Sequence, residues 1–288
     1  AGTLTLSGAN TYSGGTTLSS GTLSLGSTGA LGSSGSISFG GGTLQYTSSN
    51  TTDYSGRFST SSGQAYSIDT NGQAVTLATA LTSSTGTFTK LGTGTLTLTG
   101  ANTYTGTTTL SDGTLQLGSG GSLSASTGLS MSGTAVLDLD GNSQSFASLT
   151  GASGNIILNS SASTTSTLTV TGGTTTYAGV VKNNAGSGGT VALTVSGATL
   201  TLTGVNTYTG ATTISSGTLK LGNSSGTTLV STSAISMSGG TLDLWGYNQT
   251  IASLNSTGGS PLVTNNGSNN ATLTISGASP GSFGGVIQ

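Results

Sequence analysis

Two aspartates, Asp138 and Asp140, come closest in type and spacing to a catalytic pair in this sequence. Alternation along a strand would place both carboxylates on one face, roughly 7 Å apart. Carboxylates at such a separation act as acid and base in glycoside hydrolysis. In the later repeat, however, Trp245 stands where Asp140 would be, and no Arg, Lys or His is near the pair. We therefore interpret them as solvated residues at a strand end and expect no enzymatic activity.

Calcium binding is the second chemistry to consider, because Gly239-Gly240-Thr241-Leu242-Asp243 partly resembles the nonapeptide with which some β-helices bind calcium. That nonapeptide works in tandem, and no tandem exists here. Six dispersed aspartates cannot give several ions multiple oxygen ligands each, which leaves at most a lone surface ion. The chain has no His and no Cys, so most zinc and nucleophile sites cannot be assembled. We expect neither a metal nor a cofactor.

Asn-Thr-Tyr triplets form the most regular polar feature of the chain. They contribute Asn10 and Tyr12, Asn102 and Tyr104, and Asn206 and Tyr208. One interpretation is an aromatic row that binds sugars. The other is a structural corner, in which Asn tolerates left-handed backbone and bonds its own turn while Tyr packs beside it. The triplets lie a full repeat apart and would not form one platform, so we predict structural corners.

One segment, Thr47–Gly63, departs from the regular pattern. It is polar and irregular, and Tyr54, Arg57 and Phe58 cluster within it. It is either a loop that leaves the body of the protein or one rung with an atypical face. As an exposed cluster these three side chains would form a ligand-contact surface, so the segment is the candidate binding site.

The elements that must position these side chains come from a motif that occurs three times, at Thr3–Gly26, Thr95–Gly118 and Thr199–Gly222. Within it, leucines such as Leu96 and Leu98 alternate with threonines, which predicts strands with one buried face. Gly, Ser, Asn and Asp separate these runs and supply turns. Each copy predicts a strand, an Asn-Thr-Tyr corner, a short strand, a glycine turn and a further strand, with no helix.

The spacing of the motif predicts an array of stacked units. Gly100 and Gly204 are 104 residues apart, and a second block containing Leu137 and Leu242 recurs at 105. Inside a period, strands start about 20 residues apart, which predicts rungs of that length. The predicted units are approximately residues 1–92, 93–196 and 197–288, the last incomplete. Both ends resemble interrupted strand arrays, so we expect either a piece of a longer chain or subunits that stack end to end.

Composition favours one elongated solenoid over a compact globule. Bulky side chains are scarce, since hydrophobic residues make up 32% of the 288 residues, and a thin solenoid needs only one inward row per strand. Four Lys and Arg in total exclude a nucleic-acid surface. No apolar run reaches the length of a membrane-spanning helix, and no export signal opens the chain, so any signal or anchor lies outside this segment.

These blocks resemble the autotransporter-associated β-strand repeat of bacterial passenger domains. The matching stretches are Gly94-Thr95-Leu96-Thr97-Leu98-Thr99-Gly100-Ala101-Asn102-Thr103-Tyr104-Thr105-Gly106, Gly113-Thr114-Leu115, and their counterparts near Gly8 and Gly204. The resemblance implies an all-β fold, a right-handed parallel β-helix, and export to the cell surface or the extracellular space.

The function expected from the residues and the resemblance is a structural or adhesive stalk or fibre. Its partners would be further copies of itself, joined end to end or laterally, or adjoining repeats of a longer chain. The alternative is an adhesin module that recognises glycan or another cell surface through Tyr54, Arg57 and Phe58. A polysaccharide-active enzyme is the third alternative, and no insertion into a membrane is expected.

Overall fold

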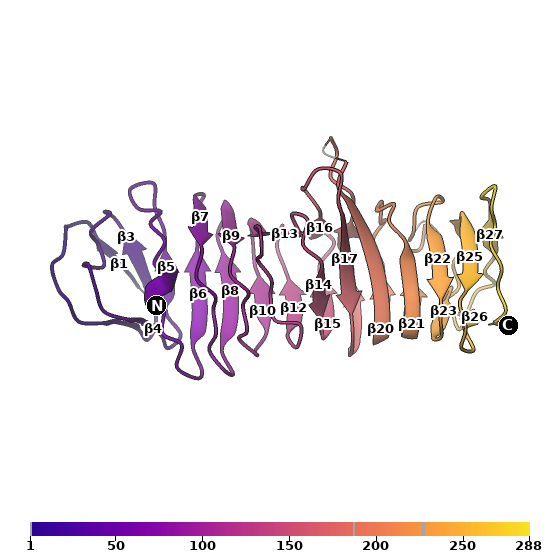
Figure 1. Cartoon of the computed structure of the whole chain (residues 1–288), viewed down its shortest axis with the longest axis horizontal. Helices are drawn as coiled ribbons and strands as arrows, with labels where there is room; N and C mark the ends of the chain where they lie inside the picture. Colours follow the sequence, from indigo (N-terminus) through magenta and orange to yellow (C-terminus); the bar gives the residue numbers. More distant parts are fainter. Residues whose placement is uncertain (1, 187, 226–227) are drawn as a thin grey trace. The chain divides into compact units, whose positions relative to one another are not determined.

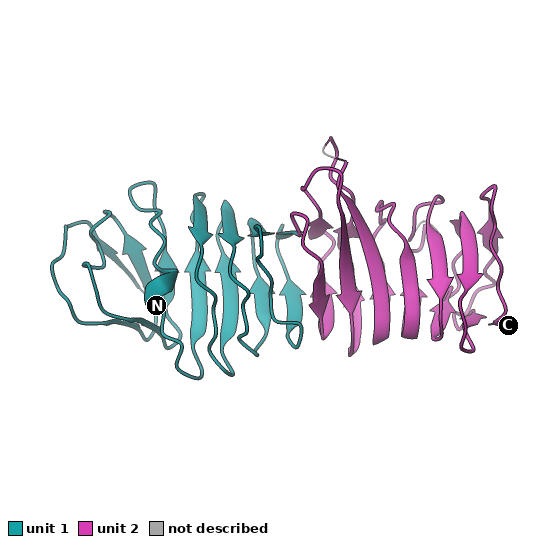
Figure 2. Ribbon diagram, viewed as in Figure 1, with its two compact units in different colours: residues 1–138 teal, residues 139–288 magenta. Residues whose placement is uncertain are grey.

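The protein is described by a computed structural model that covers residues 2–186, 188–225 and 228–288. Within these ranges the chain consists of short strands and turns, and its single helical segment is one 3-10 turn, η1 (Ser55–Arg57). Two compact units are present, residues 1–138 and residues 139–288 (Figure 2). No helix in the described ranges has both the length and the apolar character needed to cross a membrane.

The first unit is a stack of short strands that follow one another in chain order (Figure 1). Its strands are β1 (Thr3–Leu6), β2 (Thr16–Leu18), β3 (Thr22–Leu25), β4 (Ile37–Phe39), β5 (Thr43–Gln45), β6 (Ala65–Asp69), β7 (Ala74–Leu77), β8 (Thr87–Leu91), β9 (Thr95–Leu98), β10 (Thr108–Leu110), β11 (Thr114–Leu117), β12 (Gly128–Met131) and β13 (Val136–Asp138).

Parallel pairing organises this unit into sheets that run along the stack. One sheet continues through β1, β3, β5, β6, β8, β10 and β12. Another contains β7, β9, β11 and β13, where Val75, Leu96, Leu115 and Leu137 stand in register and are at most 2% exposed. Burial of each such side chain contributes roughly 1.5–3 kcal/mol, so the inward row supplies the core.

The second unit repeats this arrangement with two longer strands. Its strands are β14 (Gln144–Phe146), β15 (Ser148–Gly151), β16 (Ile156–Leu158), β17 (Thr165–Val170), β18 (Thr174–Tyr177), β19 (Val180–Val181), β20 (Thr190–Leu202), β21 (Thr212–Leu221), β22 (Ala234–Met237), β23 (Thr241–Asp243), β24 (Gln249–Ile251), β25 (Ser253–Ser256), β26 (Leu262–Thr264), β27 (Leu273–Ile275) and β28 (Val286–Ile287).

The long strands β20 and β21 each span two columns of the stack. The first half of β20 pairs with β17 and its second half with β18, and β21 continues in the same way to β22 and β23. A register shift between Val195 and Thr199 marks the bend. The inward row Leu200, Leu219, Leu242 continues the core of this unit.

Glycine is required at the turn that comes after the short strand following each Asn-Thr-Tyr corner. Gly21, Gly113 and Gly217 occupy this place in the three motif copies, and all have positive φ, of 73°, 64° and 76°. A Cβ on Gly113 would lie 2.5 Å from the carbonyl oxygen of Gly94 in the preceding rung. The turn therefore excludes a side chain through both its backbone conformation and the closeness of its neighbour.

The predicted all-β, parallel solenoid is confirmed. Strand partners lie 19 residues apart at Thr3 and Thr22 and 25 apart at Thr165 and Thr190, close to the predicted rung of about 20. The division into three sequence repeats remains a prediction, because the boundary between the two compact units, after residue 138, coincides with neither of the predicted repeat boundaries.

Candidate functional site

The irregular segment Thr47–Gly63 forms a rung of the first unit. Thr47 and Asn50 form an antiparallel bridge, and Phe58 pairs in parallel with Ile37 of the preceding rung. Tyr54 and Phe58 are only 5% and 7% exposed. Of the two structures expected for this segment, the structure thus has the rung with an atypical face, and these two aromatic rings lie in the core.

Arg57, at the end of η1, clamps this rung to the one before it. Its Nε donates to the carbonyl of Gly35 at 2.8 Å and its Nη1 to that of Gly32 at 3.1 Å. Its Nη2 donates to the carbonyls of Leu31, at 2.9 Å, and of Ser34. The guanidinium also lies 5.7 Å from the centre of the Tyr54 ring. Arg57 therefore serves first to hold the segment 31–35 in place.

An aromatic cluster supports the rung from inside. The ring of Phe39 meets those of Phe58 and Tyr66 edge to face, at centroid distances of 4.9 Å and 5.5 Å. The Tyr66 hydroxyl donates to the carbonyl of Ser59 at 2.7 Å, and burial raises the pKa of this phenol. This packing fixes the segment 58–61 on the first unit.

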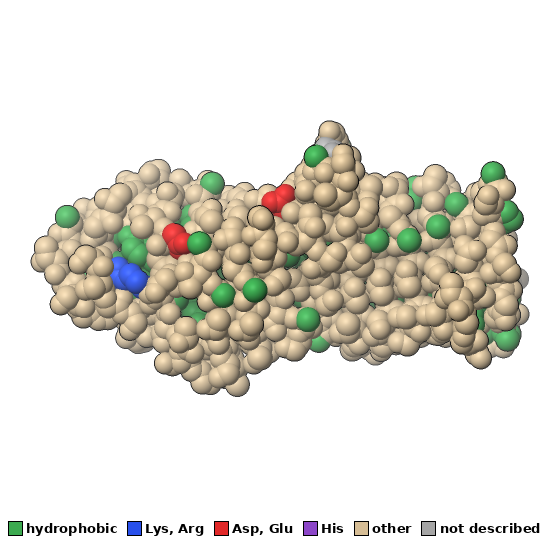
Figure 3. Space-filling model, viewed as in Figure 1, with side chains coloured by type: hydrophobic (Ala, Val, Ile, Leu, Met, Phe, Trp, Pro, Cys, Tyr) green, Lys and Arg blue, Asp and Glu red, His purple; other side chains and the backbone are tan. Residues whose placement is uncertain are grey.

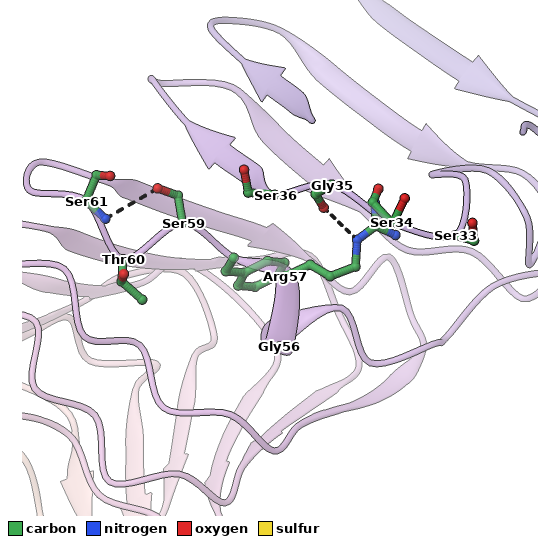
Figure 4. A pocket seen from close by; sticks show the side chains of 10 residues that line it. Ser33, Ser34, Gly35, Ser36, Gly56, Arg57, Ser59, Thr60 and Ser61 are labelled. Atoms are coloured by element: carbon green, nitrogen blue, oxygen red, sulfur yellow. Dashed lines mark hydrogen bonds between the residues drawn. The ribbon is translucent and has the colours of Figure 1, made fainter. Parts of the chain in front are cut away.

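Between these two fixed segments lies a groove of about 580 Å³. Figure 4 shows Arg57 between its two rows of residues, with a hydrogen bond from the Ser61 amide to Ser59 Oγ. The groove is lined by Ser33, Ser34, Gly35, Ser36, Gly56, Arg57, Phe58, Ser59, Thr60 and Ser61. Hydroxyls both donate and accept hydrogen bonds, and no carboxylate lines the groove, so its chemistry suits binding of a polar, hydroxylated ligand.

The Asn-Thr-Tyr corner at Asn102 links three consecutive rungs. Its Oδ1 accepts the Leu81 amide of the preceding rung at 2.8 Å, and its Nδ2 donates to the Ser122 carbonyl of the following rung at 2.8 Å. A further bond from Nδ2 to the Gly100 carbonyl closes the corner itself. Tyr104 is fully buried, and its hydroxyl shares a hydrogen bond with Thr108.

The other two corners follow the same plan to different extents. Asn206 bonds the Val181 amide of one rung and the Thr228 carbonyl of the other, and Tyr208 is fully buried. At the first corner Asn10 donates to the carbonyls of Gly8 and Ala30, and Tyr12 is 37% exposed. The six predicted corner residues thus stay in three separate places, each within its own repeat.

The aspartates considered for chemistry bond to neighbouring rungs. The prediction that both are solvated is wrong for Asp138, which is 6% exposed and accepts a hydrogen bond from Gln116 Nε2 at 3.1 Å. Asp140 accepts a hydrogen bond from Ser160. Asp243, in the partial calcium motif, accepts the amides of Trp245 and Asn266 and the Asn266 Nδ2. N–H donors surround this carboxylate, which is the opposite of a cation site. The described residues contain no group of three or more His, Cys, Asp or Glu side chains that could hold a metal ion.

Two residues that the sequence pattern did not single out stand apart in the structure. Lys90 is fully buried, and its Nζ donates to three backbone carbonyls. Burial lowers its pKa to about 8, although Asp69 and Asp112 act in the opposite direction. Trp245 is 39% exposed, with the Lys220 ammonium 3.4 Å from its ring centre. The signal for Lys90 in the sequence was its position two residues after Phe88, which places both side chains on one face of a strand. The signal for Trp245 was that it stands in the later repeat where Asp140 stands in the earlier one.

Comparison with known proteins agrees with the repeat. The passenger-associated-transport-repeat matches the chain at residues 1–25, 88–117 and 193–221, the three copies of the motif, and confirms the resemblance drawn from the sequence. This repeat and the solenoid fold both fit a passenger domain of an autotransporter. No curated protein and no solved structure matches the chain significantly.

Proposed function

We propose that this chain is a load-bearing structural segment of a secreted or cell-surface passenger. The observation that carries the proposal is the corner at Asn102, which hydrogen-bonds the rung before it and the rung after it. Together with the ladders of parallel strands, such corners place hydrogen bonds along the stacking direction. A pulling force along that direction is then resisted by many backbone bonds at once.

The exterior supports the same role. The face in Figure 3 carries few charged side chains, in line with four Lys and Arg and six Asp in the whole chain. Little Coulomb repulsion separates neighbouring molecules with such a surface, and salt changes their interaction little. We propose that this surface allows lateral or end-to-end association with further solenoid rungs. Electron microscopy over a concentration series tests this, and dispersed single particles at high concentration would contradict it.

Force spectroscopy on the single chain tests the mechanical role. A rung of about 20 residues, once pulled out, lengthens the chain by roughly 70 Å at about 3.5 Å per residue. We expect a series of such steps as rungs detach one after another. The double variant Asn102→Ala with Asn206→Ala should detach at lower force with the same step length. One single extension of the whole chain, or no resistance at all, would refute the proposal.

The second candidate function is adhesion through the hydroxyl-lined groove around Arg57. Its specific support is the concentration of serine and threonine side chains around a cavity of about 580 Å³. Such a lining suits a neutral glycan. A glycan array comparing the native chain with the groove-filling variants Ser33→Trp and Ser61→Trp tests it. Retention of every signal by both variants would exclude the groove as the binding site.

A further inference from the structure

Two internal Asn-Thr-Tyr corners join their rung to the preceding one through the same pair of hydrogen bonds. The asparagine Oδ1 accepts a backbone amide of the preceding rung, and the carbonyl of that same residue accepts the amide that follows the asparagine. At Asn102 the residue of the preceding rung is Leu81, and the two bonds measure 2.8 Å and 2.9 Å. At Asn206 it is Val181, and the two bonds measure 2.8 Å and 3.0 Å. One pattern of contact thus recurs in both units.

The first corner has the same asparagine without this partner. Asn10 donates through Nδ2 to the carbonyls of Gly8 and Ala30, and its Oδ1 accepts no hydrogen bond from any described residue. In the same rung β1 pairs in parallel with β3, the strand of the following rung. Leu4 of β1 is 61% exposed, whereas the equivalent Leu200 is fully buried. The face of this rung that points away from β3 therefore presents a hydrogen-bond acceptor and a leucine to the solvent.

β28, at the end of the second unit, presents the complementary groups. The amides of Val286 and Gln288 donate to the carbonyls of Pro261 and Val263 in the preceding rung, both at 3.0 Å. Alternate residues of a parallel strand bond to opposite neighbours. The amide and carbonyl of Ile287 therefore face away from that rung, and its side chain is 65% exposed.

The place of Ile287 in its repeat is that of Val181 in the repeat before, 106 residues earlier. β19 bonds to its preceding rung as β28 does, since the amides of Val180 and Lys182 donate to that rung. Val181 lies between them, is fully buried and bonds to the corner at Asn206. The edge of β28 thus has the form of an internal rung on which an Asn-Thr-Tyr corner is stacked.

We propose that two copies of this chain join at these edges, so that Asn10 Oδ1 of one copy accepts the Ile287 amide of the other. The Ile287 carbonyl in turn accepts the Thr11 amide, as at the two internal corners. The proposal rests on the end-to-end association proposed above and specifies its partner, its strands and its register. Main-chain bonds of this kind supply the affinity when a strand is added to the edge of a sheet.

The register of the internal corners also fixes which residues meet beside the corner. In the second unit Thr201 of β20 pairs with Thr176 of β18. The residues in the same places at the two edges are Thr5 and Ser282, so the junction brings these two opposite each other. Parallel strands lie about 4.8 Å apart, which is within the range of Cα separations that a disulfide spans. Because the chain has no cysteine, a disulfide between introduced cysteines reports this pairing alone.

Cysteine cross-linking tests the register. Chains with Thr5→Cys are mixed with chains with Ser282→Cys under mild oxidation, and the dimer is followed on non-reducing gels. Thr274→Cys replaces Ser282→Cys in the control, because Thr274 is exposed on β27 but corresponds to Thr169, whose partner Thr194 has no counterpart in the first rung. We expect the first pair to cross-link at least about tenfold faster, since the junction holds its two thiols at a high effective concentration.

A proline substitution tests the hydrogen bond at the corner. Ile287→Pro removes the amide that faces Asn10 and spares the bonds of β28 to its own rung. Sedimentation should show association weakened about tenfold, because Asn10 Oδ1 is covered without a donor. Ile275→Pro is the matched control, since Ile275 is 40% exposed and its amide also faces away from its rung, next to Ser276, which donates to Ile251. This variant should associate like the native chain.

The outcomes separate the register from association itself. Equal cross-linking of both cysteine pairs, or unchanged association of Ile287→Pro, would overturn the register and leave end-to-end association standing. Absence of both cross-linking and association of the native chain at high concentration would overturn the two together. Circular dichroism of each proline variant, expected to match the native spectrum, shows that a loss of association comes from the edge and not from unfolding.

Discussion

Lys90 offers the sharpest test of how this solenoid tolerates charge. It points inward from β8, where its partners in register are Ile68 and Leu110. In the second unit the equivalent inward place is held by Val195, which pairs with Ile214. A lysine thus stands in a row of aliphatic side chains, and it is fully buried.

The sign of its pH effect follows from the lowered pKa. Burial shifts the pKa of Lys90 from 10.5 to about 8, so between these values the unfolded chain still binds the proton that the folded chain has released. Stability therefore rises with pH across this window. At about 1.36 kcal/mol per pKa unit the shift corresponds to an upper limit of about 3 kcal/mol. We expect about 1–3 kcal/mol, because the amine keeps its carbonyl partners at Leu91, Gly92 and Asp112.

The experiment compares Lys90→Met with the native chain. Urea unfolding is followed at pH 7 and at pH 9, about one unit below the ordinary tyrosine pKa, where few tyrosines of the unfolded chain are ionised. The native chain should gain stability at the higher pH, and the methionine variant, which cannot titrate, should not. Lys182→Met, at a half-exposed lysine, is the control and should follow the native profile. Parallel pH profiles for Lys90→Met and the native chain would refute the reasoning.

Four further substitutions test the contacts that link the rungs. Asn102→Ala removes three hydrogen bonds and leaves the buried Leu81 amide without its acceptor, so we expect a loss of about 2–4 kcal/mol. Asn10→Ala, which removes two bonds at a more exposed corner, should cost about 1 kcal/mol. Both losses are measured by thermal unfolding, and equal losses would argue against the link that Asn102 makes across three rungs. Gly113→Ala should destabilise by about 1–3 kcal/mol, since its φ is 64°, and an unchanged melting temperature would show that the turn can relax. Arg57→Met should raise amide hydrogen exchange in residues 31–35, because the guanidinium holds their carbonyls; unchanged exchange there would show that the clamp is dispensable.

The sequence predicted those features of the fold that depend on local pattern. Alternation at Leu96 and Leu98 gave the buried face of β9, and the glycine at 113 gave the turn. Both are properties of a few adjacent residues and of the backbone conformations open to them. Because the motif repeats, the same strands and turns could be predicted for each further copy, since each copy packs only on the rung before it.

The candidate site was predicted less well, because exposure depends on neighbours. The cluster of Tyr54, Arg57 and Phe58 suggested a surface, yet the two rings pack inward and Arg57 bonds to the carbonyls of the segment 31–35. Nothing in the sequence of Thr47–Gly63 shows that residues 31–35 lie against it. The groove exists because the segments 31–35 and 58–61 are held in place on either side of it.

The sequence by itself determined the repeat, the rung length and the places of the turns, since these arise from contacts between residues near one another in the chain. The tertiary structure alone decided which side of a strand faces inward where the pattern is ambiguous. At Phe88-Thr89-Lys90-Leu91, either alternate pair could have been buried. A shift of one residue reverses the faces of a strand, and only the rungs containing Ile68 and Leu110 fixed the register that buries Phe88 and Lys90.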